Sequence, residues 1–238
     1  INLNQNITSK KVEKFKSLIK RRSTQEPIAY ILKNKEFWSN NFIVDKKTLI
    51  PRPETELLVE KIVKIFKNKS IFILDIGTGT GCILLSILSE LNTSRGVGID
   101  ISSQAVQIAK VNLSKHNMNC RAKFYKRSLN ELNDKKFDLI VSNPPYIMTK
   151  DIKNLQLDIK KFEPKIALDG GNDGLDVIKK VIYKSKCVLK IKGTLALEIG
   201  NGQLKKVSKI LGANNFKVRH LVRDYRQNIR CILSTLEK

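Results

Sequence analysis

The feature that most constrains the fold is a continuous apolar strand pattern that ends in a turn with three glycines. Residues 71–76 form an apolar run, interrupted by one aspartate, that is typical of a strand covered on both faces. Gly77, Gly79 and Gly81 follow, and a helix is expected to begin at Cys82. Glycines at alternate positions let the backbone turn tightly and approach a ligand closely. The segment therefore predicts a strand–turn–helix unit that binds a ligand at its turn.

The turn lacks two well-known nucleotide-binding patterns. Cys82 occupies the position of the third glycine in the dinucleotide pattern Gly-x-Gly-x-x-Gly. No Gly-Lys-Ser/Thr triplet follows the turn, so it is not a Walker A loop. An ordinary connecting turn remains the alternative, but such a turn rarely needs three glycines.

From residue 70 onward, predicted strands and helices alternate. After the first unit, strands are expected over 96–100, 122–125, 137–141 and 193–199, and helices over 102–116, 175–189 and 202–211. This alternation predicts an α/β fold with a doubly wound, mostly parallel sheet. Two last strands, over 217–222 and 229–234, have no helix between them and predict an antiparallel strand at the sheet edge.

The first part of the chain has a different pattern. Residues 8–22 place apolar side chains on one stripe and lysines on the other, which predicts an amphipathic helix. Residues 27–32 and 41–44 are expected to pair as a β-hairpin. The prolines within 50–54 predict a fixed, extended loop, and helical periodicity resumes over 55–66.

This change of pattern predicts two domains, a helix and hairpin module over 1–53 and an α/β domain over 54–238. A chain of 238 residues with 41% hydrophobic residues can bury a core without disulfides or metal. No apolar run approaches the ~18 residues that a membrane-spanning helix needs.

The cysteines and histidines are too scattered for a zinc site or a disulfide framework. We therefore expect no metal, reduced thiols and a cytoplasmic protein. The residues are Cys82, Cys120, Cys187, Cys231, His116 and His220.

The formal net charge of +23, from 45 basic and 22 acidic residues, has two interpretations. A basic surface can attract an anionic partner such as nucleic acid. Alternatively, the charge reflects an A/T-rich genome, because 35 of the basic residues are Lys and only 10 are Arg. Specific phosphate recognition favours more arginine, so we prefer the compositional interpretation.

Asp100 ends the predicted strand over 96–100, next to the glycine turn in a doubly wound sheet. A carboxylate at this position can accept hydrogen bonds from both hydroxyls of an adenosine ribose. The alternative is that it only places a favourable charge at the start of the next helix. Together, the glycine turn and Asp100 resemble the S-adenosylmethionine site of class I methyltransferases. In that resemblance, Asp75 lies near the methionine part of the cofactor.

The segment Asn143-Pro-Pro-Tyr146 follows the predicted strand over 137–141. Two prolines exclude regular pairing and fix the backbone at the edge of the sheet where ligands bind. The Asn143 amide oxygen and the Pro144 carbonyl can accept hydrogen bonds from a substrate NH2 group, and Tyr146 offers an aromatic wall. This combination suits methylation of a planar amide or amino nitrogen, which must be held and aimed. A purely structural turn is the alternative.

Several segments together resemble the protein release factor glutamine N5-methyltransferase family. Besides Asn143-Pro-Pro-Tyr146, they are Glu26-Pro-Ile-Ala-Tyr-Ile31, Glu36-Phe-Trp38, Leu49-Ile-Pro-Arg-Pro-Glu-Thr-Glu56, Glu163-Pro164, Ala167-Leu-Asp-Gly-Gly171, Asp173-Gly-Leu175 and Leu197-Glu-Ile-Gly200 with Gln203. The resemblance covers residues 10–238. It implies a class I, Rossmann-like methyltransferase fold in a monomeric enzyme. It also implies that residues 1–53 are the remnant of a helical substrate-docking domain.

The resemblance implies a role for each matching site residue. Those expected to hold S-adenosylmethionine are Asp75, Gly77, Thr78, Gly79, Thr80, Gly81, Asp100 and Asn143, with backbone contacts from Ser128 and with Arg52 and Glu54 at the pocket entrance. For Arg52 and Glu54, a local salt bridge is the alternative. Ser128 lies in the segment Lys126-Arg-Ser-Leu129, where relatives often carry an acidic residue followed by a large apolar one. Asn143, Pro144 and Tyr146 are the expected catalytic residues, and with Pro145 they would hold the substrate.

The resemblance implies methyl transfer from S-adenosylmethionine to the glutamine amide of the Gly-Gly-Gln loop in class I peptide release factors. The other product is S-adenosylhomocysteine. An adenine N6-type nucleic-acid methyltransferase is the alternative enzyme, because it shares Asn-Pro-Pro-Tyr and the charge suits it. Against this alternative, no segment is long enough for a separate DNA-reading domain. A catalytically silent binding module is the third interpretation.

Overall fold

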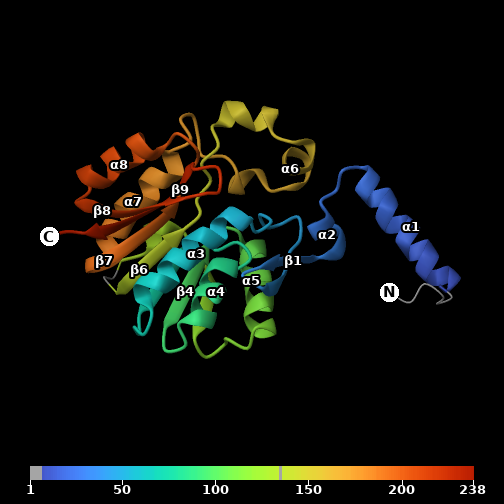
Figure 1. Ribbon diagram of the computed structural model, residues 1–238, viewed down its shortest axis with the longest axis horizontal. Helices are drawn as coiled ribbons and strands as arrows, with labels where there is room; N and C mark the ends of the chain where they lie inside the picture. Colours follow the sequence, from blue (N-terminus) through green and yellow to red (C-terminus); the bar gives the residue numbers. More distant parts are fainter. Residues whose placement is uncertain (1–6, 134–135) are drawn as a thin grey trace.

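The apolar run after residue 70 forms β3, an interior strand of a seven-stranded sheet in the computed structural model (Figure 1). The structure describes residues 7–133 and 136–238. The strands are β3 (Phe72–Ile76), β4 (Arg95–Asp100), β5 (Ala122–Lys126), β6 (Phe137–Ser142), β7 (Leu189–Glu198), β8 (Phe216–Arg223) and β9 (Ile229–Leu236). Their order is β5-β4-β3-β6-β7-β9-β8. Neighbours from β5 to β7 are parallel and β9 is antiparallel to both β7 and β8, which confirms the predicted α/β fold.

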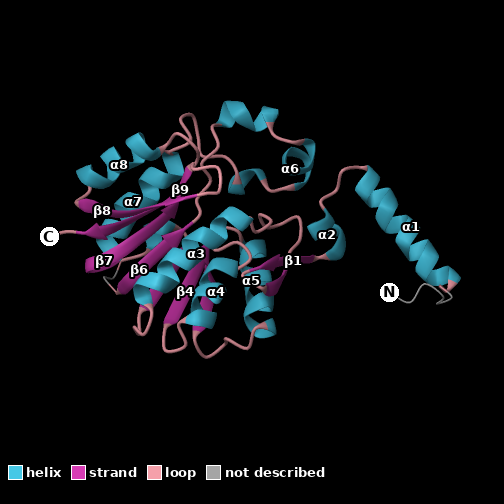
Figure 2. Cartoon of the chain, viewed as in Figure 1, coloured by secondary structure: helices cyan, strands magenta, loops and turns pink. Residues whose placement is uncertain are grey.

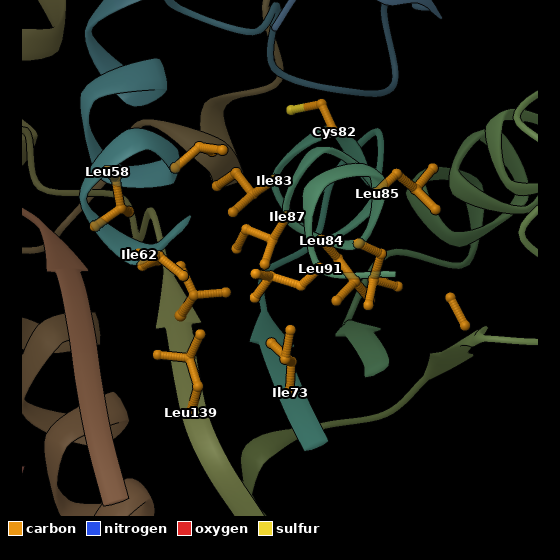
Figure 3. Packing of buried hydrophobic residues seen from close by; sticks show 14 of the residues in the cluster. Leu58, Ile62, Ile73, Cys82, Ile83, Leu84, Leu85, Ile87, Leu91 and Leu139 are labelled. Atoms are coloured by element: carbon orange, nitrogen blue, oxygen red, sulfur yellow. The ribbon is translucent and has the colours of Figure 1, made fainter. Parts of the chain in front are cut away.

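Helices cover both faces of the sheet, as Figure 2 shows. The larger helices are α3 (Pro53–Phe66), α4 (Cys82–Glu90), α5 (Ser103–Lys115), α7 (Asp176–Val188) and α8 (Leu204–Ala213). Side chains of β3 alternate between two hydrophobic clusters: Ile73 packs with α3, α4 and α5, whereas Leu74 packs with α7 and α8. In Figure 3, Leu58 and Ile62 of α3 lie over Leu139 of β6 within the first cluster. This burial on both faces explains the continuous apolar run of β3.

The N-terminal segment contains α1 (Ser9–Ser23), α2 (Ile28–Leu32), β1 (Asn34–Phe37) and β2 (Asn40–Ile43). The expected strand over 27–32 is wrong, because this segment is helical. The Pro27 carbonyl accepts hydrogen bonds from the N–H groups of Tyr30 (3.0 Å) and Ile31 (3.1 Å), which starts a helical turn. Burial of both side chains stabilises that turn.

A β-hairpin is present, as expected, but β1 and β2 form it directly after α2. Trp38 and Ser39 make its two-residue turn, each with a φ of 53°. Positive φ at both positions gives the twist that tight hairpins need, although neither residue is a usual choice there. On α5, the buried Asn112 side chain holds the hairpin to the glycine turn. Its Nδ2 donates to the carbonyls of Ile43 (3.0 Å) and Thr80 (2.9 Å).

Helix α1 projects from the rest of the molecule in Figure 1, and no residue of it is buried. Its apolar stripe exists, as expected, but Val12, Phe15 and Ile19 are exposed to solvent. The long connection after β6 contains α6 (Leu157–Phe162). It also contains two 3-10 helices, one of six residues over 149–154 and one of three residues over 165–167. None of the described helices is long and apolar enough to cross a membrane.

Candidate active site

The glycine turn joins the end of β3 to the start of α4 in the way the sequence predicts. The φ angles of Gly77, Gly79 and Gly81 are +72°, +54° and +80°, a region that favours glycine. A Cβ atom at Gly81 would lie 2.9 Å from the Phe124 ring, whereas one at Gly77 or Gly79 would meet nothing within 4 Å. The turn is therefore tightly packed at its helical end and open at the two earlier glycines. This open backbone fits the close approach of a ligand.

Asp100 lies against this turn, as expected. Its Oδ2 accepts a hydrogen bond from the Gly79 N–H (3.0 Å), and its Oδ1 accepts one from the Ser102 N–H (2.9 Å). Burial raises the pKa of Asp100, and these backbone hydrogen bonds oppose that effect. The contact with Ser102 also supports the helix start, so the two interpretations of Asp100 are compatible.

Asp75 is fully buried at the end of β3. Thr78 Oγ1 donates to its Oδ2 (2.6 Å), while Oδ1 has no hydrogen-bond partner among the described residues. Burial raises the pKa of Asp75 to about 7, and the nearby charge of Asp100 adds to this. A buried acceptor without a donor, beside an open glycine backbone, fits a ligand that carries a donor or a positive charge.

The Asn143-Pro-Pro-Tyr146 segment leaves β6 beside the glycine turn. The strand register pairs Ser142 with Ile76, and the Ser142 hydroxyl donates to the Ile76 carbonyl (2.7 Å). The segment lines a pocket of about 150 Å³. Its lining residues are Leu49, Arg52, Asn143, Pro144, Pro145, Tyr146, Ile147, Ile159, Ala167 and Leu168. The pocket is large enough for a small side chain and has mostly apolar walls with few polar groups.

Arg52 lines the same pocket, but Glu54 is exposed on the first turn of α3. Arg52 Nη2 forms an ion pair with Glu163 Oε1, and the Ile50 N–H donates to Glu163 Oε2 (3.3 Å). The side chain of Glu163 is 1% exposed, and burial raises its pKa while Arg52 opposes the rise. The local salt bridge considered for Arg52 is therefore replaced by one to the segment after α6.

The chain is similar in sequence and in fold to known proteins. A family model described as Methyltransferase small domain matches residues 53–160, and one described as PrmC N-terminal domain matches residues 1–32. The release factor glutamine methyltransferase of Buchnera aphidicola subsp. Acyrthosiphon pisum is 43% identical over 224 residues, which cover 94% of this chain and 80% of that relative. The chain belongs to the release factor glutamine methyltransferase family.

A second relative is longer than this chain, and a solved structure shares its fold at low sequence identity. The bifunctional methyltransferase of Rickettsia typhi (strain ATCC VR-144 / Wilmington) is 37% identical over 98% of this chain, but the chain spans about half (49%) of that relative. Among solved structures, the hMettl16 catalytic domain in complex with MAT2A 3′UTR hairpin 1 has a TM-score of 0.67 at 18% identity. That alignment covers 89% of this chain and 79% of the other, and it supports the fold.

Ser128 lies at the same sheet edge as Asp100. Lys126 pairs with Asp100 in the β4–β5 register, and Ser128 follows two residues later. The Ser128 N–H donates to Glu131 Oε1 (3.0 Å) within a capping box. Its backbone N–H is thus engaged, and the expected cofactor contact at Ser128 stays a prediction.

Sequence reasoning assigned no role to Thr55, Glu198 or Gln203, which support the Asn143-Pro-Pro-Tyr146 segment. Asn143 Nδ2 donates to Thr55 Oγ1 (3.1 Å), and the Tyr146 hydroxyl donates to Glu198 Oε1 (3.3 Å). Gln203 Nε2 donates to the Tyr146 carbonyl (3.0 Å). Burial raises the pKa of Tyr146, so this group stays protonated at neutral pH. A glutamate at the end of the apolar run of β7 is the signal that could have drawn attention to Glu198.

Asp75 gives the first testable prediction, on stability against pH. Burial raises the folded-state pKa of Asp75 to about 7, far above the ordinary pKa of an aspartate, so the neutral form favours folding and this contribution is lost as pH rises. Between pH 5 and pH 8, the unfolding free energy of the Asp75→Asn variant should therefore gain about 2 kcal/mol relative to wild type. Urea unfolding of both proteins without cofactor measures the difference. A pH-independent difference would contradict a raised pKa at Asp75.

Arg52 gives the second prediction. Arg52→Met should lower the unfolding free energy by about 1 kcal/mol at neutral pH, because it leaves the buried Glu163 carboxylate without its cation. The same substitution in a Glu163→Gln background should cost much less, since no buried charge is left unpaired. Equal costs in the two backgrounds would show that Arg52 contributes only through packing.

Proposed function

We propose that this chain transfers the methyl group of S-adenosylmethionine to the side-chain amide nitrogen of the glutamine in the Gly-Gly-Gln loop of class I peptide release factors. The observation that carries the proposal is the pocket at the end of β6, whose lining includes all four residues of Asn143-Pro-Pro-Tyr146. Membership of the release factor glutamine methyltransferase family supports it.

The cofactor is proposed to lie along the carboxyl ends of β3 and β4. Asp75, Gly77–Gly81 and Asp100 would hold it, with the ribose hydroxyls on the Asp100 carboxylate. When bound, S-adenosylmethionine supplies a methyl group on a positively charged sulfur and leaves as S-adenosylhomocysteine. The short path from Ile76 to Ser142 across the sheet places this region next to Asn143.

An amide nitrogen is a poor nucleophile because its lone pair is delocalised into the carbonyl group. Asn143 Oδ1 and the Pro144 carbonyl would each accept a hydrogen bond from the substrate NH2 group and hold it in one orientation. Tyr146 and the apolar pocket walls restrict the substrate side chain and exclude water. The chain's residues thus contribute positioning and fixed dipoles, and they need no proton transfer before the methyl group moves. The methylated nitrogen then loses one proton, which is released to solvent.

The remaining parts of the chain would serve the protein substrate. Residues 1–53 are proposed to belong to a helical domain that docks the release factor, and residues 54–238 to be the methyl-transfer domain. The exposed apolar stripe of α1 fits a docking role. Because release factors work in the cytoplasm, we propose a cytoplasmic enzyme. We further propose that it is a monomer.

Separate reactions with two candidate substrates test the proposal. The purified protein is incubated with methyl-labelled S-adenosylmethionine and then offered a class I release factor or double-stranded DNA in separate reactions. We expect label in the release factor and none in DNA. Labelled DNA with an unlabelled release factor would establish the nucleic-acid alternative, and no binding of the cofactor would indicate a silent binding module.

A further inference from the structure

A chain of hydrogen bonds connects Asn143 to α3 and to β7. Asn143 Nδ2 donates to Thr55 Oγ1 (3.1 Å), and Thr55 Oγ1 donates to Glu198 Oε2 (2.6 Å). Thr55 lies on the first turn of α3 and Glu198 is the last residue of β7. Both are 2% exposed, so water does not compete for these hydrogen bonds.

When Glu198 is ionised, this chain of hydrogen bonds allows only one direction of donation. An ionised carboxylate accepts hydrogen bonds and cannot donate them. Glu198 therefore accepts the one hydrogen bond that the Thr55 hydroxyl can donate. The Thr55 oxygen can then only accept a hydrogen bond from Asn143. An acceptor at this point selects the NH2 end of the Asn143 amide. The Asn143 oxygen is then the atom that remains for the pocket.

We propose that Glu198, acting through Thr55, is the positioning residue that orients the Asn143 amide so that its oxygen faces the methyl-accepting nitrogen. This inference rests on the proposed function. The two ends of an asparagine amide have nearly the same shape, so packing alone selects between them weakly. With the opposite orientation, Asn143 would present NH2 to the substrate NH2, and two donors would face each other.

The surroundings of Glu198 keep the carboxylate in place. The Tyr146 hydroxyl donates to Glu198 Oε1, whereas Thr55 donates to Oε2. Both carboxylate oxygens therefore accept a hydrogen bond. Burial raises the pKa of Glu198 to about 7, the charge of Arg230 on β9 opposes this, and Glu54 on α3 adds to it. Cys231 on β9 also faces Glu198, and burial keeps its thiol protonated. The hydrogen bonds from the Thr55 and Tyr146 hydroxyls oppose the rise in the pKa of Glu198 and favour the ionised form, in which both Oε atoms accept.

Loss of the Thr55 hydroxyl tests the proposal. Thr55→Val keeps the shape of the side chain, and we expect single-turnover methyl transfer to a release factor to slow about tenfold, because the Asn143 amide loses its orientation. Thr55→Ser restores the hydroxyl and should recover most of the rate. Affinity for S-adenosylmethionine should stay the same in both variants, since the glycine turn and Asp100 are intact.

Glu198 is tested in parallel with variants that retain or remove an acceptor. Glu198→Gln can still accept from Thr55 through its amide oxygen and should retain most of the rate. Glu198→Met has a similar length without an acceptor and should slow transfer about as much as Thr55→Val. Thermal unfolding of each variant checks that it is folded. If a variant at one position does not fold, the pair of variants at the other position decides the outcome.

A double-mutant cycle separates positioning from a structural effect. In an Asn143→Ala background there is no amide to orient, so Thr55→Val should cause no further loss of rate. If Thr55→Val slows the Asn143→Ala protein as much as wild type, or slows neither, the positioning role is wrong while the proposed function stands. If wild type itself fails to methylate the release factor, the proposed function fails instead.

Discussion

Replacing Asn143 with alanine is expected to slow methyl transfer to a release factor by ~10²–10³-fold, the usual loss for one preorganised polar contact at a reacting centre. The pocket lining and the hydrogen bond from Asn143 Nδ2 to Thr55 place this amide at the carboxyl edge of β6. Alanine removes the oxygen that accepts from the substrate nitrogen. The effect should fall mainly on the transfer step, because the glycine turn and Asp100 are intact.

Single-turnover rates, with cofactor affinity measured separately by calorimetry, distinguish these steps. Asn130→Ala is a matched control, since Asn130 is exposed and does not line the pocket. The control should transfer at the wild-type rate. A near-normal rate in Asn143→Ala would show that Asn143 is only a turn residue, and the catalytic role of this segment would be abandoned.

Replacing Asp100 with alanine is expected to weaken S-adenosylmethionine binding by about 3 kcal/mol, or ~10²-fold, the upper range for a charged acceptor that serves buried hydroxyls. Two losses combine here. The ribose hydroxyls lose their acceptor, and the Gly79 N–H loses the carboxylate that ties the glycine turn to β4. Both effects act on binding, so the transfer rate at saturating cofactor should change much less.

Asp100→Asn is the matched control for this second prediction. Its amide oxygen can still accept from the Gly79 N–H, whereas the negative charge is lost. We expect its affinity to lie between those of wild type and the alanine variant. Calorimetry that shows unchanged affinity in Asp100→Ala would contradict the ribose assignment.

The parts of the fold that depend on local sequence were predicted well. The run before Gly77 is apolar at every position but Asp75, and together with the glycine turn that follows it is typical of a strand buried on both faces. Alternating elements then restrict the sheet to a doubly wound order, and the observed order agrees. The strand predicted over 27–32 was wrong because a short apolar run fits a strand or a helix equally. The hydrogen bonds to the Pro27 carbonyl, which decide between them, are not visible in residue types.

The supporting contacts of the site could not be predicted for a different reason. Glu163 lies 111 residues after Arg52, and Glu198 lies 143 residues after Thr55. These partners meet because the start of α3 lies against the end of β7, where Glu198 is, and against the segment after α6, where Glu163 is. A single sequence shows that a buried-looking glutamate needs a partner. It does not show which hydroxyl or guanidinium group is opposite.

The site of methylation in a release factor tests the central claim most directly. The protein is incubated with S-adenosylmethionine and a class I release factor, and the proteolytic peptides are analysed by tandem mass spectrometry. The account predicts one added methyl group on the side-chain amide of the glutamine in the Gly-Gly-Gln loop, and none on a release factor with that glutamine replaced by glutamate. A methyl group on another residue, or equal methylation of the glutamate variant, would contradict it.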